Sequence, residues 1–184
     1  MSTLRVLAIS GSLRARSSNT ELLKAAVLLA PESLHIVLYT GLNALPHFNP
    51  DLDGDEAVPP PQVASLRAMV AEADALLISS PEYAHGVPGA LKNALDWLVS
   101  SPEIMYKPIG LLNASPRSTH AHASLAETLR TMSTEIVSEA SLTFPLGGRR
   151  LDAAGIAADT ELHAMLRSAL NALEAAARAH RDRL

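Results

Sequence analysis

Short apolar runs alternate along this chain with longer segments of helical periodicity. The apolar runs cover residues 4–10, 34–39, 75–78, 108–113 and 139–144. Because these runs are nearly continuous, they predict strands that are covered on both faces. The helical segments cover residues 21–30, 63–73, 88–99, 122–132 and 160–181. This repeated β-α order predicts an α/β fold, a doubly wound five-stranded parallel sheet in a single domain over residues 1–184.

The composition is that of a globular domain. The chain has 184 residues, of which 48% are hydrophobic, and its net charge of −4 gives no reason to expect nucleic acid as a partner. It has no cysteine, which excludes disulfides, thiolate metal sites and thiol catalysis. No apolar run approaches the roughly 20 residues of a membrane span. The N-terminus lacks the layout of a signal peptide, so we expect a cytoplasmic protein without a membrane partner.

The loop after the first predicted strand is rich in small hydrogen-bonding groups. Its polar side chains are Ser12, Arg14, Arg16, Ser17, Ser18, Asn19 and Thr20. Since a helix follows, backbone N–H groups at the helix start add to a ready anion site. The segment has neither the glycine pattern of a dinucleotide site nor a Walker lysine, so it suits a single phosphate best. The alternative is an ordinary turn in which Ser18 or Asn19 caps the helix.

The loop after the third predicted strand could hold a flat ligand. Tyr83 offers an aromatic face, Pro81 a rigid apolar wall, and Gly86 room for close approach. The alternatives are a half-buried core role for Tyr83 and a solvated charge for Glu82. Strands one and three flank the switch point of the flavodoxin-like strand order 2-1-3-4-5, where ligands of open α/β sheets bind. We therefore expect a phosphate-binding site and a pocket for a flat ring in the same cleft.

Two motifs in these loops resemble a known family. The first is Gly11-Ser12-Leu13-Arg14 with Ser17 and Asn19; the second is Pro81-Glu82-Tyr83 followed by residues 88–97 (PGALKNALDW). Both are similar to the NADPH-dependent FMN reductase family, which includes bacterial quinone and chromate reductases. The resemblance extends from about residue 4 to residue 176. It implies a flavodoxin-like fold, bound FMN, and a homodimer or homotetramer with the flavin near a subunit interface.

The resemblance also implies a set of cofactor-binding residues. Ser12, Arg14, Ser17 and Asn19 would hold the FMN phosphate, with Gly11 and Ser18 in the same loop. Pro81, Glu82, Tyr83, Ala84 and His85 would line the isoalloxazine ring, and Ser115 would lie close to it. No side chain is expected to act as an acid or base, so no catalytic residue is assigned.

Three positions depart from the family pattern. The asparagine that usually follows the tyrosine is replaced by Ala84 and then His85. Backbone N–H groups, in place of a side-chain amide, would therefore have to contact the edge of the flavin. Arg16 stands where the family often has glycine. The usually glycine-rich loop after the fourth strand reads ASPRSTH over residues 114–120. The last change affects the expected shape of the acceptor pocket.

Several other side chains are weaker candidates. His120 and His122 are two residues apart, so a helix would turn them to different faces, and capping or surface roles are favoured over a metal site. An EF-hand beginning at Asp51 is rejected because the required glycine and glutamate are absent. His85 could donate to a substrate oxygen or simply turn toward solvent. The arginine pair at residues 149–150 could meet a nicotinamide nucleotide phosphate or be a solvated loop charge.

The remaining expectations concern function and assembly. We predict an FMN-dependent NAD(P)H oxidoreductase that uses NADPH or NADH and passes electrons by a ping-pong mechanism to a small-molecule acceptor. Quinones, free flavin, azo dyes and metal oxyanions such as chromate are possible acceptors. The alternatives are a flavin-binding electron carrier without nicotinamide turnover and a scaffold that has lost FMN. The proline-rich stretch at 41–62 and the helix around Trp97 are the expected contact surfaces between subunits.

Overall fold

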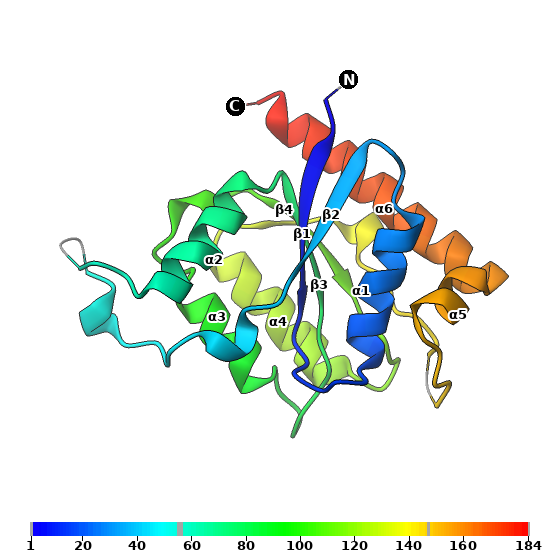
Figure 1. The fold of residues 1–184 in the computed structure, drawn as a ribbon, viewed down its shortest axis with the longest axis horizontal. Helices are drawn as coiled ribbons and strands as arrows, with labels where there is room; N and C mark the ends of the chain where they lie inside the picture. Colours follow the sequence, from blue (N-terminus) through cyan, green and yellow to red (C-terminus); the bar gives the residue numbers. More distant parts are fainter. Residues whose placement is uncertain (1, 55–56, 147, 184) are drawn as a thin grey trace.

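A parallel sheet lies at the centre of the computed structural model, which describes residues 2–54, 57–146 and 148–183 (Figure 1). The strands are β1 Leu4–Ser10, β2 Leu34–Tyr39, β3 Ala75–Ser79, β4 Pro108–Leu112 and β5 Glu135–Ile136. The helices are α1 Ser18–Leu29, α2 Pro61–Glu72, α3 Gly89–Asp96, α4 Thr119–Thr131, α5 Ala153–Ala158 and α6 Thr160–Arg181. Short 3-10 turns lie at Leu42–Ala44, Pro50–Leu52, Pro102–Ile104 and Ser138–Ala140.

The five strands pair in the order β2-β1-β3-β4-β5, and all neighbours are parallel. The register places Leu7 between Val37 and Leu76, and Ile78 beside Leu111. Every residue of β3 and β4 is buried, as the nearly continuous apolar runs predict. The predicted fold class and strand order are confirmed.

Helices cover both faces of the sheet, with α1, α5 and α6 on one side and α2, α3 and α4 on the other (Figure 1). Alternate residues of β1 divide between the two cores. Val6 and Ala8 belong to the core under α1 and α6, whereas Leu7 and Ile9 belong to the core under α2, α3 and α4. Successive side chains of a strand point to opposite faces, so one short strand supplies both hydrophobic layers.

The prediction of a fifth strand over residues 139–144 is wrong. The paired strand is β5, four residues earlier, and Ser138–Ala140 forms a 3-10 turn instead. The Ser141 hydroxyl accepts a hydrogen bond from the Leu111 N–H at 3.1 Å and donates to the Val137 carbonyl at 2.8 Å. These side-chain bonds satisfy groups that a strand ladder would use, and they favour the turn. Pairing resumes only at an isolated bridge between Asn113 and Thr143.

Other boundaries differ by a few residues. Helices α2 and α4 start at Pro61 and Thr119, earlier than expected, and α5 was not predicted. Pro88 is the N-cap of α3 rather than its first helical residue. Beyond Asp96 the backbone continues in turns instead of the predicted helix to residue 99.

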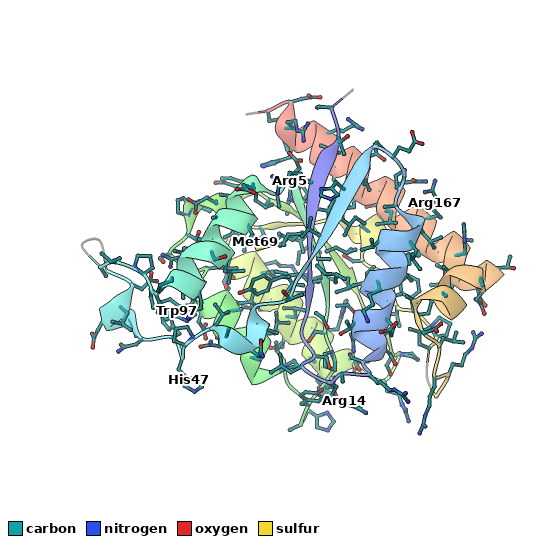
Figure 2. The ribbon with its side chains drawn as sticks, viewed as in Figure 1. Arg5, Arg14, His47, Met69, Trp97 and Arg167 are labelled. Atoms are coloured by element: carbon teal, nitrogen blue, oxygen red, sulfur yellow. The ribbon has the colours of Figure 1, made fainter. Side chains whose placement is uncertain are left out.

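Pro46 and Phe48, in the proline-rich stretch at 41–62, contact α3 and the Trp97 that follows it. The indole N–H of Trp97 donates to the Pro46 carbonyl at 2.8 Å, and the Asn93 amide donates to the same oxygen at 2.9 Å. Phe48 meets the Trp97 ring edge-on at a centroid distance of 5.0 Å. Figure 2 shows Trp97 and His47 together on this side of the molecule. The Trp97 side chain is fully buried, so a subunit contact through the helix around it would use other residues of that helix.

Two further observations bear on the sequence predictions. Among the described residues, no helix has both the length and the apolarity to cross a bilayer. In the rejected EF-hand segment, Asp51 lies in a 3-10 turn that Asn49 caps, whereas Asp55 lies outside the described residues.

Substituting Gly110 tests the packing of the sheet on α6. A Cβ atom at this position would lie 3.0 Å from Leu77 Cδ1 and 3.1 Å from the Ala140 carbonyl oxygen. Gly110→Ala should therefore lower the free energy of unfolding by about 1–3 kcal/mol. Gly89→Ala is the matched control, because its Cβ would meet nothing within 4 Å, and it should raise stability by about 0.4–1 kcal/mol. Urea denaturation of both variants measures the difference, and equal effects would contradict it.

Candidate functional site

The loop between β1 and α1 presents the start of a helix at the carboxyl edge of the sheet. Ser17 is the N-cap, with extended backbone, and its hydroxyl accepts from the Thr20 N–H at 3.5 Å. The cap is thus Ser17 rather than Ser18 or Asn19. The Ser10 and Thr20 hydroxyls are 2.8 Å apart and tie the loop to the strand end. This arrangement leaves N–H groups of the first helical turn available for an anion.

The loops after β1 and β3 lie against one another. The Gly11 N–H donates to the Ser79 carbonyl at 2.8 Å, and the Ser79 hydroxyl donates to the Asn19 amide oxygen at 2.9 Å. A Cβ at Gly11 would lie 2.6 Å from the Ser80 hydroxyl oxygen, so only glycine fits there without displacement. The sequence prediction that these two loops share one edge of the sheet agrees with this geometry.

Residues 83–86 form a two-residue hairpin turn. The Tyr83 N–H donates to the Gly86 carbonyl at 3.1 Å, and the Gly86 N–H donates back to the Tyr83 carbonyl at 2.9 Å. Both central residues are left-handed, Ala84 at φ 48° and His85 at φ 60°. Positive φ at both positions is the pattern of a type I′ turn, which favours asparagine and glycine. Ala84 therefore holds a conformation that a Cβ atom disfavours.

Glu82 fastens this turn to the start of α4. One carboxylate oxygen accepts from the Ala121 N–H at 2.9 Å, and the other lies 3.1 Å from His85 Nδ1. The Ala121 bond is the main reason that the pKa of Glu82 is lowered, and the His85 contact adds to it. Glu82 is thus not the solvated charge that the sequence allowed. His85 is turned to solvent, with a side chain that is 77% exposed, and its ring meets His120 edge-on at 4.6 Å between centroids.

The loop between β4 and α4 supplies a third wall. The Asn113 amide oxygen accepts from the Ser115 N–H at 3.1 Å, and the Ser115 hydroxyl accepts from the Arg117 N–H at 3.3 Å. The Ser118 N–H donates to the Ser115 carbonyl at 3.0 Å. Local side-chain bonds of this kind shape the loop without the glycines that the family pattern has.

These loops surround an open cleft of about 1070 Å³. The predicted site residues on its wall are Ser12, Arg14, Ser17, Ser18, Asn19, Pro81, Glu82, Tyr83 and Ser115. Gly11, Ala84 and His85 are not part of the lining. Figure 2 shows Arg14 at the end of the molecule where β1 leads into α1, opposite the end that carries Arg5 and Arg167. The sequence thus predicted most of three walls of the cleft.

A fourth wall was missed. It consists of residues 148–152 with Leu146, in the loop between Phe144 and α5. The Ala153 N–H donates to Glu21 at 2.9 Å and holds this loop beside α1. Arg149 also pairs with Asp159 at 2.5 Å. The only sequence signal was the arginine pair after two glycines, which is equally typical of a solvated loop.

The histidines do not form a metal centre in the described residues. No group of three or more histidine, cysteine, aspartate or glutamate side chains is arranged there to hold a metal ion. His120 lies beside His85, whereas His122 is partly buried on α4, where burial lowers its pKa. They face different surroundings, as their spacing predicts.

Comparison with known proteins decides the family. The family model for NADPH-dependent FMN reductase matches residues 4–147. An NAD(P)H-dependent FMN reductase of Pseudomonas aeruginosa is 32% identical over 176 residues, which is 93% of this chain and 94% of that protein. The chain belongs to the NADPH-dependent FMN reductase family. The resemblance in the two loop motifs is confirmed.

Two further similar proteins extend the comparison. A probable NADPH:quinone oxidoreductase of Oryza sativa is 46% identical over 96 residues, and the matched part spans 51% of this chain and about half, 47%, of the rice protein. The structure of FerB, a flavoenzyme NAD(P)H:(acceptor) oxidoreductase from Paracoccus denitrificans, aligns with a TM-score of 0.76 at 27% identity. That alignment covers 97% of this chain and 99% of FerB.

Substitutions at Ala84 test the strain in the turn at residues 83–86 of this family member. Ala84→Asn should raise the free energy of unfolding by about 0.5–1 kcal/mol, because asparagine adopts the left-handed conformation more readily. Ala84→Val should lower it, since a β-branched residue is least tolerant of positive φ. The side chain is exposed, so neither change disturbs the core. Urea denaturation should give the stability order Asn, Ala, Val, and a reversed order would show that the turn is not left-handed.

Proposed function

We propose that this protein is an FMN-dependent NAD(P)H oxidoreductase. The observation that carries the proposal is that the serine-rich loop after β1 and the tyrosine loop after β3 line one cleft. Its volume of about 1070 Å³ lies slightly above the range of about 300–1000 Å³ that is usual for small-molecule sites. The cleft is thus large enough for a mononucleotide with a second ligand beside it.

The residues of the α1 side fit a phosphate group. Ser12 and Ser17 offer hydroxyls, Arg14 offers a guanidinium, and the capped start of α1 offers backbone N–H groups. Asn19 holds the loop through Ser79 and also lines the cleft. A dianion at this point would be stabilised by the helix dipole and by charged hydrogen bonds.

The opposite side fits a flat ring. Pro81 and Tyr83 contribute apolar surface to the lining of the cleft, and Ser115 contributes to it from the loop after β4. The carboxylate of Glu82 already accepts two hydrogen bonds from protein groups, so its role there is to hold the turn. We propose that backbone groups of Ala84 and His85 replace the side-chain amide that the family usually supplies.

The chemistry that FMN supplies when bound is hydride acceptance from reduced nicotinamide and electron delivery to a second substrate. Ser12, Arg14 and Ser17 would hold the phosphate, and Tyr83 and Ser115 would hold the ring. The two substrates would then use the cleft in turn, which would give ping-pong kinetics. Its relatives are named for FMN and for quinones, and we propose quinones, free flavin, azo dyes and metal oxyanions as acceptors here. We also propose a homodimer or homotetramer.

A visible absorption spectrum and a coupled assay test the proposal. The purified protein should show the absorption bands of bound flavin, and it should oxidise NADPH or NADH in the presence of excess quinone. A yellow protein that oxidises neither nucleotide would favour the electron carrier. A protein that takes up no FMN on titration would favour a scaffold that has lost its cofactor.

Arg14→Ala tests the proposed role of Arg14 in phosphate binding. A charged hydrogen bond to phosphate contributes about 1.5–3 kcal/mol, so FMN affinity should fall roughly tenfold or more. Fluorescence titration of the apo protein with FMN measures the change. Arg130→Ala is the matched control, since this arginine lies on α4 and pairs only with the exposed Glu127. Equal FMN affinities in the Arg14 variant and the control would show that Arg14 does not bind the phosphate.

A further inference from the structure

Glu21 joins the start of α1 to the fourth wall of the cleft. It lies one helical turn after the N-cap Ser17, to whose carbonyl its own N–H donates at 2.9 Å. One oxygen of its carboxylate accepts from the Ala153 N–H at 2.9 Å, and the other accepts from Lys24 at 2.8 Å. The Glu21 side chain is only 19% exposed and lies on the lining of the cleft. A largely buried carboxylate thus connects the helix start that fits a phosphate to a residue 132 positions later in the chain.

The fourth wall is also fastened on its other side. The Arg149 guanidinium pairs with Asp159 at 2.5 Å, and Asp159 caps α6 by accepting from the Leu162 N–H at 3.1 Å. The loop is therefore tied to α6 just before Arg150 and to α1 just after it. Figure 1 shows the resulting arrangement, in which α5 and the loop that leads into it lie beside α1.

Arg150 lies between these two anchors. In the part of the chain that the structure describes, its side chain makes no ion pair and donates no hydrogen bond, in contrast to the neighbouring Arg149. Arg150 is exposed and lines the same cleft as Arg14. Three residues of extended chain span at most about 10 Å, so Arg150 stays close to Ala153. The Glu21 contact therefore holds the loop of Arg150 beside the start of α1.

A flavin phosphate can use a donor from this second loop. A phosphate monoester carries a charge of about −1.5 to −2 at neutral pH and has three strong acceptor oxygens. The loop after β1 offers donors from one segment, with Ser12, Arg14 and Ser17 on the lining. A guanidinium on the fourth wall can add two parallel hydrogen bonds. Because its loop is already fixed at two points, Arg150 loses less conformational freedom on binding, which favours affinity.

We propose that Glu21 is a positioning residue for FMN, which holds the fourth wall against α1 so that Arg150 binds the flavin phosphate together with Arg14. The proposal rests on the proposed function. It assigns a carboxylate a favourable part in binding an anion. By its charge alone Glu21 would repel the phosphate, and its removal would strengthen FMN binding. The positioning role predicts the opposite, because removal of the acceptor for the Ala153 N–H releases the loop that carries Arg150.

Titrations of the apo protein with FMN and with riboflavin, which lacks the phosphate, test the part of Arg150. Arg150→Ala should lower FMN affinity about tenfold or more and change riboflavin affinity by less than about twofold. Arg150→Lys should retain part of the FMN affinity, because it keeps the charge and loses the planar fork. Arg130→Ala is again the control, with both affinities unchanged. No loss of FMN affinity in Arg150→Ala, or an equal loss for both flavins, would overturn the assignment.

Substitutions at Glu21 test the positioning role in the same titrations. Glu21→Ala should lower FMN affinity by up to about tenfold, the effect of losing Arg150, and leave riboflavin affinity within about twofold. Glu21→Gln keeps an oxygen that can accept from the Ala153 N–H, so FMN affinity should stay within about twofold or rise. Glu21→Ala combined with Arg150→Ala should bind FMN at most about twofold more weakly than Arg150→Ala alone, because the two residues act through one contact.

The outcomes separate the positioning role from the proposed function. Tighter FMN binding in Glu21→Ala would show that the carboxylate acts only through its charge and would overturn the role. Equal losses in Glu21→Ala and Glu21→Gln, or independent losses in the double variant, would overturn it as well. A protein that shows the expected flavin affinities but oxidises neither NADPH nor NADH would contradict the proposed function and support the positioning role.

Discussion

The closeness of the loops after β1 and β3 is the constraint on which the rest of the site depends. Gly11 lies so near Ser80 that a Cβ atom would approach within 2.6 Å of its hydroxyl. The Asn19 bond to Ser79 then fixes the first turn of α1 to the end of β3. Because of these contacts, a helix start that attracts anions and a loop with an aromatic ring face the same space. The adjacent pairing of β1 and β3 makes this possible, and it is the general reason why ligands bind at the switch point of such sheets.

The charge distribution shows how a chain with net negative charge can present a basic cleft. Most arginines elsewhere in the described residues are held in ion pairs, as with Arg181 and Asp74 at 2.5 Å. Acids at the cleft cap helices and fasten loops, and the five arginines on its lining outnumber the three acidic residues there. Within this region the acidic side chains thus stabilise the loops and helix ends, whereas the arginines give the cleft its basic character. The net charge of −4 describes the whole surface and says little about this concavity.

In the turn at residues 83–86, unfavourable backbone conformations are held by hydrogen bonds. Ala84 and His85 both have positive φ, which disfavours most residues that carry a Cβ atom. The paired hydrogen bonds between Tyr83 and Gly86 and the Glu82 contacts to Ala121 and His85 hold the turn against this cost. Strain of this kind persists only where surrounding contacts determine the conformation, and it concentrates at functional sites.

The sequence by itself determined the fold class, the strand order and three walls of the cleft. Nearly continuous apolar runs such as residues 75–78 can only be buried strands in this context, and parallel strands present the loops after them at a common edge. The tertiary structure alone decided the position of β5, the presence of α5 and the fourth wall. The short helix at Ala153–Ala158 has too few residues to show a period. The loop before it is placed by the Glu21–Ala153 contact, which joins residues 132 apart and leaves no local pattern in the sequence.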